Sequence, residues 1–187
     1  MVRYAVQVVM DAGYEDDEAL SRSLRDLDQA AWTFLFDEHH VKIWRYAFAR
    51  TGDRGLADDI ASQVFAEALD SIHRFRFKGS PVLAWLYRIA RNQLGKRLRS
   101  AKREVGRAAP EPSANPTEAT LDAIVLSEAL TSLTQDQADA VVLRFYSTYS
   151  TREIAAAMGK SESAIYSLQI RAMASLRRHL KDRRKNS

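Results

Sequence analysis

The chain has 187 residues, of which 46% are hydrophobic and 28% charged, with a net charge of +4; this composition fits one or two folded domains. It contains no cysteine, which excludes a disulfide framework and a thiolate metal site. No apolar run approaches the roughly 20 residues that cross a bilayer, and the short apolar piece at 5–10 lacks the features of a secretory signal. We therefore expect a cytoplasmic protein without membrane insertion.

The charge is distributed in blocks along the chain. Residues 81–107 carry a net charge of +7 and residues 148–187 carry +6, whereas residues 108–147 between them carry −5. Two basic blocks separated by an acidic one predict two distinct contacts with a polyanion, instead of one diffuse cationic surface.

Helix-forming residues dominate, so we expect an all-α fold of two small domains. Residues 1–15 show no motif and are expected to be a mobile extension. The first domain spans 16–103 and begins with helices at 17–27 and 28–50, with Asp28 as a possible N-cap of the second. Thr51-Gly52-Asp53 predicts the end of that helix and the cap of the next.

A helix at 54–72 has the clearest apolar pattern, with paired apolar residues recurring every four positions. Its other side carries Asp58, Asp59, Ser62, Gln63, Glu67 and Asp70. The pattern alone favours a solvated acidic face, and a docking surface is the alternative.

The loop at 73–80 alternates cations with aromatic rings, in the order Arg74, Phe75, Arg76, Phe77 and Lys78. Aromatic rings can stack on unpaired bases while the cations follow the phosphates. Alternatively, Phe75 and Phe77 turn inward and fill the core, and the pattern does not decide between these two readings.

A long basic helix is expected to start at Ser80 and Pro81, since proline is tolerated in a first helical turn. Its apolar residues face the core, and its other side carries Arg88, Arg91, Arg99 and Arg103. Gly95 lowers the stability of this helix by up to about 1 kcal/mol relative to alanine, which leaves its continuity at that position open. Together with the aromatic loop, this basic helix could bind DNA whose strands have separated. The alternative is that its basic side only keeps the protein soluble.

Residues 104–120 hold three of the four prolines and predict a flexible linker. The second domain then spans 121–182, and 183–187 form a basic tail. Thr134 and Gln137 have capping-box spacing, and they open a helix whose apolar stripe is Ala138, Val141, Val142 and Phe145.

A helix-turn-helix is predicted at the end of the second domain. Ser150 and Glu153 form a capping box, Gly159 suits a left-handed turn, and Ser161 can cap the following helix. In this motif the second helix lies in the DNA major groove. The competing interpretation, a two-helix corner of an ordinary helical protein, is disfavoured by the combination of Ala155, Gly159 and Ile165.

Three segments together carry a family resemblance. They are Asp59-Ile60 through Phe65, the run Ala84-Trp85-Leu86-Tyr87-Arg88-Ile89-Ala90-Arg91-Asn92, and the stretch from Ser150 to Arg177. In this order, and split by a proline-rich linker, they resemble sigma factors of bacterial RNA polymerase of the extracytoplasmic-function (ECF) class. The resemblance covers about residues 16–182.

The resemblance implies a transcription initiation factor that binds core RNA polymerase, directs it to promoters and promotes DNA opening. The expected contacts with the β′ clamp helices are Asp58, Asp59, Ser62, Gln63 and Glu67, and the second domain would touch the β flap. Minus-ten DNA would contact Arg74, Phe75, Arg76, Phe77, Lys78, Ser80, Arg88, Arg91 and Asn92. Minus-thirty-five DNA would contact Ser161, Ser163, Tyr166, Ser167, Ile170 and Arg171. An anti-sigma factor is also an expected partner.

Two departures from the family pattern concern binding. Ser62-Gln63 stands where the family commonly has Gln-Glu, which removes one charge from the docking face. Tyr166 and Leu168 stand where Lys and Arg are frequent in the recognition helix. Because these cations anchor phosphates and read guanine, the base preference of this helix is left open.

Other function classes have less support in the sequence. A helix-turn-helix regulator that binds duplex operator DNA without polymerase is the main alternative, but it leaves the aromatic loop and the first basic block without a role. An enzyme with an accessory DNA-binding domain is the third candidate function. His39 and His40 are adjacent and cannot face one metal from a helix, so we expect no catalytic residues, metal, cofactor or small-molecule substrate.

Overall fold

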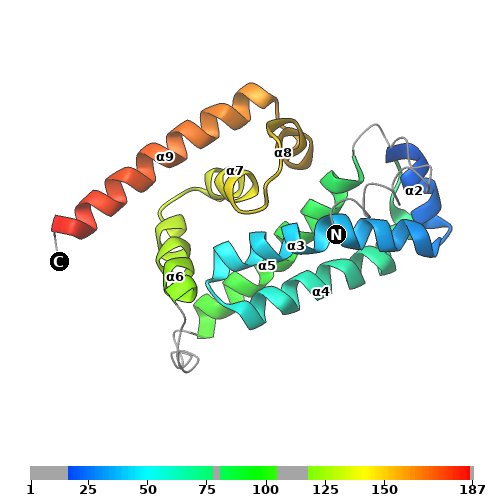
Figure 1. The fold of residues 1–187 in the computed structure, drawn as a ribbon, viewed down its shortest axis with the longest axis horizontal. Helices are drawn as coiled ribbons and strands as arrows, with labels where there is room; N and C mark the ends of the chain where they lie inside the picture. The colour runs from blue at the N-terminus through cyan, green and yellow to red at the C-terminus, as the bar shows by residue number, and fades with distance from the viewer. Residues whose placement is uncertain (1–16, 78–80, 105–117, 186–187) are drawn as a thin grey trace.

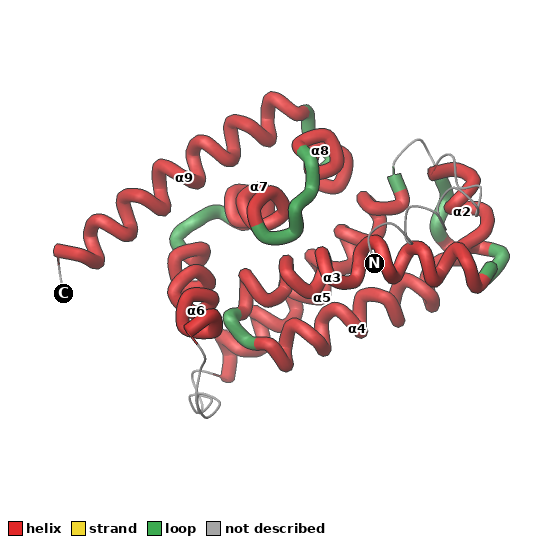
Figure 2. Tube along the Cα trace, in the orientation of Figure 1, coloured by secondary structure: helices red, strands yellow, loops and turns green. Residues whose placement is uncertain are grey.

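The computed structural model describes residues 17–77, 81–104 and 118–185. Every regular element within these ranges is a helix (Figure 2), which agrees with the expected all-α class. None of the described helices combines the length and apolar character of a membrane span. The expectations for residues 1–15, Lys78, Ser80 and most of the linker lie outside the described residues.

The N-terminal half consists of α2 (Asp17–Arg25), α3 (Gln29–Thr51), α4 (Arg54–Ser71), the short 3-10 helix η1 (Ile72–Arg74) and α5 (Val82–Glu104). Local signals set its boundaries. The Ala31 amide donates to the Asp28 carboxylate at 2.8 Å, and the Leu56 amide donates to Asp53 at 2.9 Å. Gly52 ends α3 with a φ of 69°, a conformation that costs glycine little.

The C-terminal half consists of α6 (Glu118–Thr131), α7 (Gln135–Phe145), α8 (Thr151–Met158) and α9 (Glu162–Lys185). Both predicted capping boxes are present, Thr134 with Gln137 and Ser150 with Glu153. Gly159 ends α8 with a φ of 64°. The helix-turn-helix is therefore confirmed as a local structure.

Several sequence expectations differ from the structure. Phe145, expected in an apolar stripe, is 60% exposed, and Leu69, a member of the paired apolar pattern expected at 54–72, is 50% exposed. The long basic helix begins at Val82, after Pro81, and it continues through Gly95. The first helix of the C-terminal half begins at Glu118, inside the segment predicted as linker.

The two halves pack against each other (Figure 1). Helix α8 lies on α5, and α6 and α7 lie on α3. A single apolar cluster runs through both halves; Leu35 and Ile43 belong to it, as do Leu143 and Ile154. The sequence predicted two domains joined by a flexible linker, and the structure adds that the two are in direct contact.

Candidate functional site

Helix α9 and Ser161, which caps its start, present the predicted duplex-reading residues to solvent. Ser161, Ser163, Tyr166, Ser167, Ile170 and Arg171 are all exposed. The opposite face packs inward through Ile165 and Ala172, each 0% exposed. Tyr166 and Ile170, one turn apart, are 55% and 70% exposed. Two large apolar side chains exposed on the second helix of a helix-turn-helix favour contact with a partner surface.

The turn between α8 and α9 fixes how this face is presented. The Lys160 amide donates to the Ala155 carbonyl at 2.9 Å, and the Ala164 amide donates to the Ser161 hydroxyl at 3.2 Å. Ile154 and Ile165 are fully buried on either side of the turn. The short helix is thereby held against the long one while the start of α9 stays open to solvent.

The N-terminal half carries a second basic surface, which we call the arginine groove. It has a volume of about 800 Å³ and is lined by Arg74, Arg76, Arg88, Arg91 and Asn92, together with Trp85 and Tyr87. Its other wall is formed by Ala156, Ala157 and Met158 of α8 and by Gly159, which follows that helix. The groove therefore lies between the two halves.

The two rings of the aromatic loop differ in position. Phe75 is 8% exposed and packs on Trp85, with ring centroids 4.8 Å apart. For Phe75 the structure thus shows the inward alternative, whereas Phe77 is half-buried. The Arg76 guanidinium donates to the carbonyls of His73 and Phe75 at 2.7 and 3.1 Å, which ties the cation to its own loop.

The predicted polymerase-docking residues divide into two groups. Asp58, Asp59, Ser62 and Gln63 are exposed on α4, and the Trp44 indole donates to Asp58 at 2.6 Å. Glu67 instead accepts a hydrogen bond from Gln93 of α5 and lines the arginine groove. Four of these residues are therefore exposed on α4, whereas Glu67, one turn after Gln63, is half-buried and bonded to α5.

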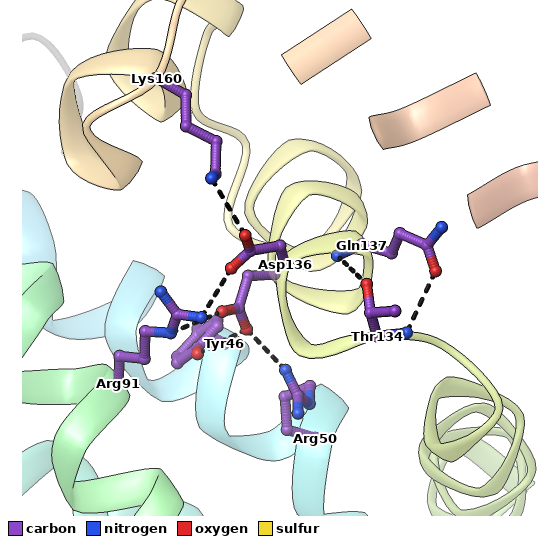
Figure 3. Close-up of polar contacts among 8 residues, drawn as sticks. Tyr46, Arg50, Arg91, Thr134, Asp136, Gln137 and Lys160 are labelled. Atoms are coloured by element: carbon purple, nitrogen blue, oxygen red, sulfur yellow. Dashed lines mark hydrogen bonds and ion pairs between the residues drawn. The ribbon is translucent and has the colours of Figure 1, made fainter. Parts of the chain in front are cut away.

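A buried acid that is not among the predicted site residues lies at the contact between the halves, where Figure 3 shows its partners Tyr46, Arg50 and Arg91. Asp139 of α7 is 0% exposed. Its carboxylate accepts from the Tyr46 hydroxyl at 2.8 Å and from the Arg50 guanidinium at 2.6 Å. Arg91 Nε lies 3.2 Å from its second oxygen. The sequence feature that could have indicated this burial is that Asp139 directly follows Ala138, a position of the expected apolar stripe.

Asp136, one turn before Asp139, adds a second link to Arg91. Arg91 Nη2 lies 2.6 Å from Asp136 Oδ1, and Lys160 Nζ lies 3.0 Å from Asp136 Oδ2. Hydrogen bonds from Lys160 and Arg91 lower the pKa of Asp136. Burial raises the pKa of Asp139, an effect that the Arg50 guanidinium opposes. Arg91, expected at minus-ten DNA, is thus held by two carboxylates of the other half.

Metal ligation has no support in the part of the chain that the structure describes. No group of three or more His, Cys, Asp or Glu side chains there could hold a metal ion. His39 and His40 sit on different sides of α3: His39 contacts the Tyr149 hydroxyl at 3.2 Å, and His40 stacks on Phe36.

Comparison with known proteins decides the family. The Sigma-70 region 2 family matches residues 35–104, and the Sigma-70, region 4 family matches residues 129–178. The ECF RNA polymerase sigma factor BldN of Streptomyces coelicolor is 33% identical over 181 residues, which cover 90% of this chain and 69% of that protein. The chain belongs to the ECF sigma factors. It is a transcription initiation factor, and the alternative of a polymerase-independent regulator is not favoured.

Solved structures agree with the fold of this sigma factor. CnrH, in complex with the cytosolic domain of CnrY, gives a TM-score of 0.67 at 23% identity and covers 89% of this chain and 97% of its own. The sigma factor RpoE of Bartonella quintana, in complex with the anti-sigma factor NepR, gives 0.51 at 25% identity, with 74% of this chain and 89% of its own covered.

Proposed function

We propose that this ECF sigma factor divides promoter reading between its two halves. The exposed face of α9 reads the minus-thirty-five element as duplex, and the arginine groove takes the opened minus-ten strand. The observation that carries this proposal is the presence of two separate surfaces in one chain, one a helix-turn-helix and the other a groove lined by arginines and aromatic rings. Neither role needs bond chemistry, so the protein acts as a binding factor in the cytoplasm.

Minus-thirty-five recognition would depend on an unusual apolar contribution. Tyr166 and Ile170 present exposed apolar surface at the centre of the face, which suits contact with thymine methyl groups in the major groove. Arg171, which also bonds the Ser167 carbonyl at 3.1 Å, would supply the cation for a phosphate or a guanine. This helix would therefore favour sites rich in A·T pairs.

Minus-ten recognition would use Arg74, Arg88 and Asn92, which are exposed beside the groove. Cations that follow the phosphates and a ring that stacks on a base together offset the cost of strand separation. Phe77 is the aromatic candidate for stacking because Phe75 is buried against Trp85.

Polymerase docking would use Asp59, Ser62 and Gln63 on the exposed acidic face of α4, placed against the β′ clamp helices, with the C-terminal half at the β flap. Because the related sigma factor RpoE was solved with an anti-sigma factor, we include an anti-sigma factor among the partners of this chain. It would compete with polymerase for these faces.

The test is co-elution of the full chain with bacterial core RNA polymerase on gel filtration, followed by transcription from a promoter library. Asp59→Lys should weaken core binding at least about tenfold, since it reverses a charge on the proposed docking face. Asp26→Lys, the same charge change at an exposed site outside the proposed surfaces, is the matched control. Tight binding of the wild-type chain to duplex DNA without any binding to core would instead establish the regulator.

A further inference from the structure

We propose that Asp136 and Asp139 form an internal latch that occupies Arg91 and holds the free sigma factor closed over its own minus-ten surface. The latch rests on the proposed function, in which the arginine groove, lined in part by Arg91, takes the opened minus-ten strand. In the closed form, carboxylates of the C-terminal half take the positions beside this arginine that DNA phosphates would otherwise take.

The contacts of the latch join residues that lie far apart in the chain. Arg91 of α5 binds Asp136 at 2.6 Å and Asp139 at 3.2 Å. Arg50 of α3 binds Asp139 at 2.6 Å. An arginine that already neutralises two carboxylates must release them before it can bind a phosphate, because its donors are shared. Promoter DNA and the latch therefore compete for the same guanidinium.

Helix α8 adds a steric part to this competition. It packs directly on α5, and its residues from Ala156 to Met158, with the following Gly159, line the arginine groove together with Arg88, Arg91 and Asn92. In Figure 1, α8 lies above the middle of the N-terminal bundle. A DNA strand that runs past these side chains has to displace α8 from its present position.

The spacing of promoter elements gives an independent argument. Elements centred near minus ten and minus thirty-five are separated by about 25 base pairs, or roughly 85 Å of duplex at 34–36 Å per turn. In this structure a minus-ten residue and the C-terminal half are joined by a 2.6 Å ion pair. The closed form therefore cannot read both elements at once.

The covalent connection allows the halves to separate. Glu104 and Glu118, the last residue of α5 and the first of α6, are joined by a segment that can extend to about 50 Å at ~3.6 Å per residue. Opening thus needs no unfolding of either helical half, only loss of the contacts between them.

The chemistry of the latch suits a reversible contact. Burying a carboxylate removes its hydration, and this cost offsets much of the attraction to its partners; the pKa of Asp139 is accordingly raised by burial. An apolar side chain would pack at this position without that cost. The acid instead makes the closed state depend on its arginine partners, so a competitor for them favours opening.

The first experiment measures the distance between the halves without polymerase. The chain has no native cysteine, so Ala66→Cys on α4 and Arg178→Cys on α9, both at exposed positions, accept spin labels for pulsed electron resonance. The wild-type chain should give one narrow distance distribution. Asp139→Asn should broaden it toward longer distances, and Asp26→Asn, which removes the same charge elsewhere, should leave it unchanged.

Because Asp139 is buried, its variant needs a check on folding by circular dichroism. Asp136→Asn is the second variant, since the Asp136 side chain is 34% exposed and its loss leaves the core intact. Both variants should also bind a random-sequence single-stranded 20-mer at least about fivefold more tightly than wild type, within the usual range of coupling between sites. Asp26→Asn controls for the change in net charge.

Two results would overturn the latch: a broad distance distribution in the wild-type chain, or folded Asp136→Asn and Asp139→Asn chains that keep the closed distance. These outcomes are separable from failure of the proposed function. If the two latch variants open as expected but the wild-type chain does not co-elute with core polymerase, the polymerase role is refuted and the latch stands.

Discussion

The Nδ1 atom of His39 lies 3.2 Å from the hydroxyl oxygen of Tyr149, a residue 110 positions later in the chain. His39 is on α3, and Tyr149 is in the segment that precedes α8, so this contact joins the two halves at a second place besides the latch. Both side chains are buried, at 9% and 2% exposure. Tyr149 also lies beneath Lys42, whose ammonium is 5.1 Å from the ring centroid.

This buried histidine predicts a pH dependence of stability. Burial and, to a smaller extent, Lys42 lower the pKa of His39 from 6.5 to about 4, whereas Glu38 and Glu153 oppose the shift. The folded chain then binds fewer protons than the unfolded chain. The contribution of His39 to stability is therefore constant well above pH 6.5 and falls as the pH drops toward 4, by about 2 kcal/mol at pH 5.

The measurement is urea denaturation at pH 7 and pH 5, which stays above the range where most carboxylates titrate. His39→Asn lacks the titrating ring and should lose most of the difference between the two pH values. His40→Asn, at the neighbouring half-buried position, is the matched control and should keep it. An equal pH response in wild type and His39→Asn would contradict the assignment to His39.

Replacing the two rings of the aromatic loop should have different effects, one on stability and the other on DNA opening. Phe75→Ala removes a ring that is 8% exposed and packed on Trp85, and such a cavity costs about 3–5 kcal/mol of stability. Phe77→Ala should change stability by less and should slow open-complex formation while polymerase binding is kept. Thermal unfolding and permanganate footprinting measure these two effects. Unimpaired opening by Phe77→Ala would leave the ring with a packing role only.

Arg171 predicts an electrostatic contribution to duplex binding. Arg171→Ala should weaken binding of the minus-thirty-five duplex and lower the slope of log affinity against log salt by about 1 if the contact is to a phosphate. Arg177→Ala, an exposed arginine further along α9, is the control. Fluorescence anisotropy at several salt concentrations gives the slope. Affinities that match the wild type at every salt concentration would remove Arg171 from the interface.

Replacing Gly159 in the turn of the helix-turn-helix should cost stability because of its backbone conformation. Its φ is +64°, and a Cβ there would meet nothing within 4 Å, so Gly159→Ala costs only the backbone strain, about 1–2 kcal/mol. Gly159→Asn should cost less because asparagine tolerates this conformation. Gly95→Ala, inside α5, should instead stabilise by up to about 1 kcal/mol. Denaturant unfolding compares the three; equal stability of Gly159→Ala and wild type would show that the turn adapts.

The sequence predicted most helix boundaries because their causes are local. Asp28, Asp53 and Ser150 cap amides within three residues, and Gly159 ends its helix by its own backbone preference. The predicted DNA-reading face of α9 is exposed as a unit for a similar reason, since helical periodicity assigns its residues to one side. The family, too, was recognisable from motifs that are short and contiguous.

Tertiary structure alone decided which side chains meet across the chain. Phe75 fits either a DNA-stacking or a core position by its neighbours in sequence, and only the proximity of Trp85 places it inside. The basic and acidic blocks were visible as charges, but their pairing through Arg91 and Asp139 needs α7 to lie against α3, within reach of the Arg91 side chain. Burial, partner and orientation depend on how helices pack, and helical periodicity carries no information about which helix will be the neighbour.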